Sequence, residues 1–203
     1  MNTTTPYLNQ ENLTTITESI KFIVSIISPL IAGYIGVSYG LKQIKLQKRM
    51  DLIENQLNKF YSPILGLHKE IRAHGDLRVK INTLGNQAWQ EKCKDFHDGN
   101  TAPDITPYTE EIQYNNKKLK ETFIPQYNEM LRIFRENYWL AEPETRVFYT
   151  TLVEFVEVWN RNDAGGLPPD VALKINHSEE NLKPFYDELE SRTDKLRKEL
   201  LKI

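Results

Sequence analysis

The sequence contains a single cysteine, Cys93, so the chain cannot form an internal disulfide bond. This fits a reducing compartment or a fold that needs no covalent cross-link. Positive charge is not in excess either, because the chain has 26 lysines and arginines against 28 aspartates and glutamates, a formal net charge of -2. We therefore expect no broad basic surface for nucleic acid.

The sequence also lacks common catalytic and metal-binding motifs. It has no glycine-rich phosphate-binding loop, no His-Glu-x-x-His pair and no Cys-x-x-Cys pair. The strongest remaining candidate is the stretch CKDFHD, where Cys93 and His97 are four residues apart and Asp95, Asp98 and Asp104 are near in sequence. Such side chains suit a divalent metal, but one cysteine and one histidine rarely suffice. We expect no catalytic site and no cofactor, and we keep a metal-dependent enzyme that uses this region as an alternative.

Long uncharged runs are absent with one exception. Residues 22–41, FIVSIISPLIAGYIGVSYGL, carry no charged side chain and lie between Lys21 and Lys42. A hydrocarbon core about 30 Å thick requires roughly 20 apolar helical residues, and helices in lipid tolerate interior proline and glycine. Tyr34 and Tyr39 suit the boundary between lipid and water. The run therefore predicts a transmembrane helix over residues 21–42.

Two other interpretations of this run are weaker. A buried helix of a soluble protein is usually shorter than 20 uncharged residues. A cleaved signal peptide has a basic leader and an apolar run of roughly 7 to 15 residues, whereas the leader here, residues 1–20, carries two glutamates and no base.

Basic residues after the run predict its orientation. Lysines and arginines beside a membrane span tend to stay in the cytoplasm, and Lys42, Lys45, Lys48 and Arg49 follow the run while only Lys21 precedes it. We expect residues 1–20 outside and the C-terminal part in the cytoplasm, with the four bases in contact with anionic lipid. The lysine-, isoleucine- and asparagine-rich composition favours a bacterial inner membrane.

Small residues recur every four positions within the run, at Ser28, Ala32, Gly36 and Gly40. This spacing aligns them on one helix face, where they permit close approach of a second helix in lipid. The pattern predicts a homo-oligomer.

A helical stripe of apolar residues follows the basic cluster. Its members alternate steps of four and three, namely Leu46, Met50, Ile53, Leu57, Phe60, Ile64, Leu67 and Ile71. Pro63, with Ser62 as an expected cap, predicts a new helix at this point. Residues 43–61 are therefore predicted to form a short amphipathic stalk, with at most two heptads of coiled coil.

The remaining residues, 62–203, are predicted to form a cytosolic helical bundle. We expect helices over residues 62–84, 88–96, 108–138 with a kink at Pro125, 143–161, and from 178 to the C-terminus with a start delayed by Pro184. Loops are expected at residues 98–107 and at NDAGGLPPD, residues 162–170. No segment alternates cleanly enough to be a strand, so the predicted fold class is all-α.

These observations favour a membrane-anchored interaction module, a scaffold, sensor or assembly protein with an unidentified protein partner. The two predicted loops are the places where such a partner is expected. The alternative is an oligomeric effector that perturbs the membrane, as in anti-phage defence, with Ser25, Ser28 and Ser38 as its polar lining.

Overall fold

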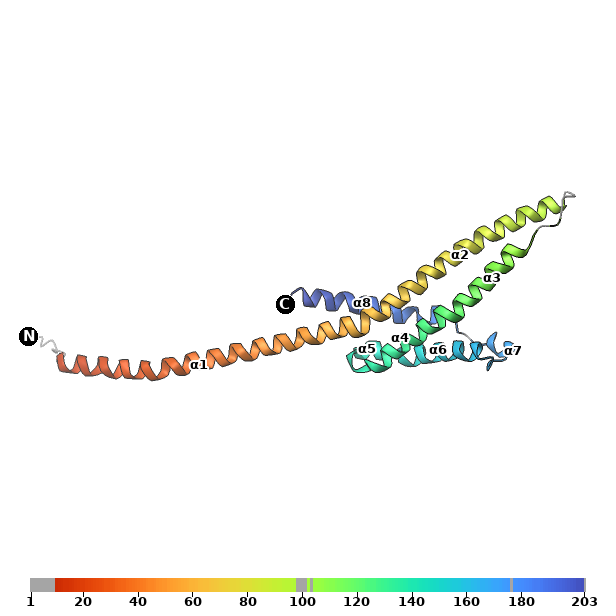
Figure 1. The fold of residues 1–203 in the computed structure, drawn as a ribbon. Helices are drawn as coiled ribbons and strands as arrows, with labels where there is room; N and C mark the ends of the chain where they lie inside the picture. Colours follow the sequence, from red (N-terminus) through yellow and green to blue (C-terminus); the bar gives the residue numbers. More distant parts are fainter. Residues whose placement is uncertain (1–9, 98–101, 103, 176, 203) are drawn as a thin grey trace, which may run out of the picture. The chain divides into compact units, whose positions relative to one another are not determined.

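The computed structural model describes residues 10–97, 102, 104–175 and 177–202. Figure 1 shows a helical chain, and no strand occurs among the described residues, which confirms the all-α class. The elements in chain order are α1 (Gln10–Gln56), the π-helix η1 (Leu57–Tyr61), α2 (Ser62–His97), α3 (Thr106–Lys118), the π-helix η2 (Leu119–Phe123), α4 (Ile124–Glu136), the 3-10 helix η3 (Tyr138–Leu140), α5 (Pro143–Arg146), α6 (Tyr149–Asp163), α7 (Pro169–Ala172), the 3-10 helix η4 (Glu179–Leu182) and α8 (Lys183–Leu200).

The chain divides into two compact units, residues 1–51 and residues 52–203. We call the second one the helical unit. The described residues of the first unit all belong to α1, which continues through Pro29 without a break. Ser25 donates a hydrogen bond from its Oγ to the Phe22 carbonyl (2.7 Å), so its hydroxyl is satisfied within its own helix.

The apolar stripe that follows the basic cluster is confirmed from Ile53 onward. Its buried members are Ile53, Leu57, Phe60, Ile64 and Ile71. The first three lie in the segment expected to form a stalk, and they belong to the core of the helical unit. The helix period therefore identified the buried face, because the same face meets the core at every turn.

The helical unit is built around a cluster of aromatic rings in edge-on and stacked contact. The Phe134 ring lies 5.0 Å from the Phe60 ring and 5.7 Å from the Phe185 ring, measured between centroids. The cluster therefore joins η1, α4 and α8. The His68 ring of α2 also stacks on the Tyr186 ring of α8, with centroids 3.4 Å apart.

Two prolines of the helical unit, Pro63 and Pro125, each follow a π-turn. Ser62 donates its backbone N–H to the Leu57 carbonyl, and Ile124 does the same to Leu119, five residues back in each case. Pro63 and Pro125 come next. Because proline has no N–H and its ring crowds the carbonyl four residues earlier, the wider turn accommodates it without ending the helix. At Pro125, where a kink was expected, the structure has this π-turn.

Three local expectations were wrong. Ser62 is no cap, because its own backbone is helical, with φ -67° and ψ -40°. The helices predicted over residues 62–84 and 88–96 are one helix, α2, which continues through Gly85 with α3 alongside; the Trp89 and Tyr108 rings are 5.0 Å apart. The helix predicted over residues 143–161 is divided into α5 and α6.

Turn chemistry explains how the last helices begin and end. Gly165 adopts a φ of +69° after α6, and Gly166 donates its N–H to the Arg161 carbonyl (2.8 Å), the arrangement of a Schellman motif. Ser178 caps η4 by accepting from the Glu180 N–H (3.2 Å). The α-helix proper starts only at Lys183, so the delay predicted from Pro184 is confirmed.

Candidate functional site

The first unit exposes an apolar segment, residues 22–41, that no other part of the described chain covers. Phe22 and Ile31 lie on opposite sides of α1, and they are 67% and 54% exposed. The most apolar window of 18 residues has a mean hydropathy of 1.9, and none of it is buried. At 1.5 Å per residue the segment is about 30 Å long. It is the one described helix long and apolar enough to cross a membrane.

The small residues predicted to pack helices lie within this segment. A methyl group placed on Gly36 or Gly40 has no other group within 4 Å in the described chain. Ser28 and Ala32 are exposed as well. Nothing in the described part of the chain thus accounts for small side chains at these positions.

The predicted lipid-contact residues lie immediately after the apolar segment on α1. Lys42, Lys45, Lys48 and Arg49 are all exposed. Three of them, Lys42, Lys45 and Arg49, line one shallow hollow together with Tyr39. Positions three and four apart share a helix face, so these cations form a localised positive patch beside a phenol ring. Lys48 does not line this hollow.

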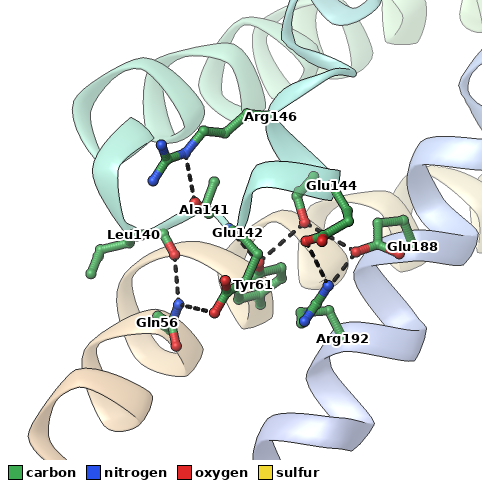
Figure 2. A network of polar contacts seen from close by, with 10 residues as sticks. Gln56, Tyr61, Leu140, Ala141, Glu142, Glu144, Arg146, Glu188 and Arg192 are labelled. Carbon is green, nitrogen blue, oxygen red and sulfur yellow. Dashed lines mark hydrogen bonds and ion pairs between the residues drawn. The ribbon is translucent and has the colours of Figure 1, made fainter. Parts of the chain in front are cut away.

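A polar network holds the helical unit together, and Figure 2 shows its residues. Gln56, at the end of α1, donates from Nε2 to the Leu140 carbonyl (2.9 Å) and to Glu142 Oε1 (3.0 Å). On α8, Arg192 contacts Glu144 (3.0 Å) and Glu188 (3.4 Å). The network therefore ties the segment around α5 to both α1 and α8.

Tyr61 is the centre of this network. Its hydroxyl accepts from the Glu142 backbone N–H (3.0 Å) and lies 3.1 Å from the Thr145 hydroxyl. Thr145 donates in turn to Glu188 Oε1 (3.3 Å), so Tyr61 is the donor toward Thr145. Burial raises the pKa of Tyr61, which keeps this donor protonated. These groups satisfy one another and hold the fold rather than presenting a reactive atom.

The Cys93 and His97 region is only partly described. Cys93 is half-buried on α2, and Asp104 is exposed before α3. The side chains of Asp95 and His97, and all of Asp98, lie outside the described residues. Among the side chains that are described, no group of three or more His, Cys, Asp and Glu residues could hold a metal ion.

One further pattern, residues 36–40, GVSYG, matches the Gly-x-Ser-x-Gly form of a nucleophile elbow. That motif works on a sharp turn between a strand and a helix, which exposes the serine oxygen. Here the five residues lie inside α1, in uninterrupted helix. Ser38 is therefore not presented as a nucleophile of this kind.

Sequence reasoning did not identify the network residues Gln56, Tyr61, Thr145 and Arg192. Comparison of the chain with protein-family models, curated proteins and solved structures found no match.

Proposed function

We propose that this protein is a membrane-anchored helical interaction module. In this proposal residues 21–42 span the bilayer once, residues 1–20 lie outside, and the helical unit lies in the cytoplasm and binds a partner. The observation that supports it is a difference in the burial of apolar side chains. The apolar segment is exposed on every side, while the helical unit has a buried core of its own. A bare apolar helix is stable in hydrocarbon and costly in water.

Membrane extraction tests the anchor. The full-length protein is expected in the membrane pellet after ultracentrifugation of a lysate, resistant to alkaline carbonate and released by detergent. Recovery of monodisperse full-length protein from the supernatant without detergent would refute the proposal.

The single cysteine provides a native test of orientation. Cys93 belongs to the part proposed to be cytoplasmic and is half-buried rather than inaccessible. A membrane-impermeant maleimide is expected to label it only after the cells are permeabilised. A Cys93→Ser, Thr4→Cys variant is the matched control and is expected to be labelled in intact cells. Labelling of Cys93 in intact cells would contradict the proposed orientation and indicate the opposite one.

Association of the span with a second copy is part of the proposal. Small side chains at Gly36 and Gly40, with open space around them, would permit a close helix pair. We expect Gly36→Leu to reduce cross-linked dimer in membranes, and Val37→Leu, one position away, to leave it unchanged. Equal cross-linking in both variants would contradict the proposed interface at Gly36.

A membrane-perturbing oligomer stays an alternative prediction. Its test is dye leakage from cells on expression of the protein, which Gly36→Leu is expected to abolish.

A further inference from the structure

A cavity of about 650 Å³ lies in the helical unit, between α2, the turn from η2 into α4, α6 and residues 175 and 177–180. Pockets of roughly 300 to 1,000 Å³ are typical of small-molecule sites. Four elements far apart in the sequence form its walls, so the site exists only in the folded unit.

Aromatic rings line one part of this cavity. The Tyr127 ring contacts the Phe155 ring edge-on, with centroids 5.0 Å apart, and Phe155 lies 6.4 Å from Trp159. His177 lies edge-on to Trp159 at 5.6 Å. Phe123 completes the apolar lining. Such a wall offers π faces to an apolar or cationic ligand.

The charged lining contains an excess of carboxylate. Arg72 is already paired with Asp76, at 3.4 Å along the same helix. This leaves Arg78 opposite Glu179 and Glu180, and neither acid forms an ion pair in the described residues. Two arginines, Arg72 and Arg78, therefore stand against three acids, Asp76, Glu179 and Glu180, in the lining.

Several polar atoms around the cavity lack partners in the described chain. Glu179 Oε1 and Trp159 Nε1 are buried without a hydrogen bond. A smaller hollow of about 140 Å³ shares Glu179 with the cavity, and there His68 Nδ1 and the Tyr186 hydroxyl are likewise unpaired. Unpaired buried polar atoms are uncommon in folded proteins, and several around one space indicate a site that a ligand or water completes.

The charge of Glu179 acts on its neighbours. Burial raises the pKa of Tyr127 and of Tyr186, and the charge of the Glu179 carboxylate raises both further. A side-chain hydrogen bond with Glu179 also contributes to the raised pKa of Tyr127. The carboxylate therefore lies close enough to make this end of the cavity electronegative.

We propose that this cavity binds a small organic cation, an amine or guanidinium group carried on an apolar body. The cation would lie beside Glu179 and offset the net charge of the lining, and the apolar body would pack on Tyr127, Phe155 and Trp159. Cations bind to aromatic faces in this way, and a desolvated carboxylate strengthens the attraction. An anion is disfavoured, because Arg72 is engaged by Asp76 and the acids outnumber the remaining base.

The test uses three probes of similar shape and different charge: phenethylamine, 2-phenylethanol and 3-phenylpropionate. The full-length protein is purified in detergent micelles with Trp89→Phe and Trp139→Phe, so that Trp159 alone reports binding by fluorescence. We expect saturable binding with the amine tightest and the carboxylate weakest, by at least about fivefold between the extremes. A tighter carboxylate, or no saturable signal from any probe up to about 10 mM, would overturn the proposal.

A charge-removing variant locates the site. Glu179→Gln is expected to weaken phenethylamine about fivefold or more and to leave 2-phenylethanol unchanged. Glu110→Gln, on the exposed surface of α3, is the control and is expected to change neither. If Glu179→Gln folds, by circular dichroism, and keeps wild-type affinity for the amine, the assignment is wrong. If Glu179→Gln fails to fold, the ranking of the three probes on the protein with Glu179 intact still decides whether the cavity prefers a cation. Membrane extraction tests the membrane anchor separately.

Discussion

The two units of this chain arrange the apolar side chains of their helices in opposite ways. In the first unit, residues 22–41 expose their isoleucines, valines and leucines all round. In the helical unit, equally apolar residues are confined to one face of each helix and are buried against other helices. A stripe indicates a protein neighbour, and an all-round apolar surface indicates a solvent that is itself apolar. The predictions that follow test this contrast.

The largest effect is expected from a core ring. Phe134 is fully buried among Phe60, Tyr149 and Phe185. Phe134→Ala is expected to lower the free energy of unfolding of the helical unit by about 3 to 5 kcal/mol, because it leaves a cavity. Phe22→Ala, on the bare segment, is the matched control and is expected to leave it unchanged. Denaturant unfolding followed by circular dichroism measures both; a similar loss in the two variants would break the comparison.

A charge on the bare segment is expected to have the next largest effect. Ile31→Lys places an ammonium group near the middle of residues 22–41, which costs roughly 2.5 to 3.5 kcal/mol on insertion. The fraction that resists carbonate extraction is expected to fall. Ile112→Lys, at an exposed position of α3, is expected to leave membrane association as it is. Full membrane retention of Ile31→Lys would contradict the assignment of a span.

A smaller loss is expected from the centre of the polar network. Tyr61→Phe removes the hydroxyl that connects the Glu142 N–H with Thr145 and leaves both without this partner. The expected loss in the free energy of unfolding is about 1 to 3 kcal/mol. Tyr114→Phe, at an exposed position, is expected to change it by less than about 0.5 kcal/mol. Equal stabilities for the two variants would show that the network contributes nothing.

The smallest effect concerns pH. Burial lowers the pKa of His68 from 6.5 in the folded chain, and Arg72 and Lys69 lower it further while Glu190 and Asp187 raise it. The unfolded chain therefore binds the proton first as pH falls below 6.5, and this part of the stability is present above that pH and lost below it. We expect the wild type to lose more stability than His68→Phe between about pH 7.5 and about pH 5.5. Parallel curves for the two proteins would exclude His68 as the cause.

Periodicity predicted the parts of the fold that depend on one helix at a time. The buried residues of the first stripe, from Ile53 to Ile71, stand where the steps of three and four placed them. The buried residues Tyr186, Leu189, Thr193 and Leu196 of α8 follow the same period. The delayed start of the last helix at Lys183 followed from Pro184. These features are local, because a helix face is defined within a few turns of chain.

What depends on distant segments was not predictable. Gln56 and Tyr61 bond to groups 84 and 81 residues away, and no spacing in the sequence marks such a pairing. Gly85 and Asn86 lie where the sequence predicted a break between two helices, yet α3 packs beside them and α2 continues as one helix. The cavity around Trp159 and Glu179 is formed by residues from four separate parts of the chain, so no contiguous motif in the sequence predicted it. Tertiary packing decides each of these.

The π-turn before Pro63 has a consequence for evolution by insertion and deletion. A π-turn is an α-helix that has gained one residue, and one residue corresponds to a rotation of about 100° around the helix axis. Because the wider turn absorbs that rotation, deleting a single residue among 57–61 would leave Ile53 and Gln56 near their present faces but would restore an α-helical turn, in which the Pro63 ring crowds the carbonyl four residues earlier. The length of this short stretch is therefore expected to resist change more strongly than the identity of its exposed residues, Asn58 and Lys59.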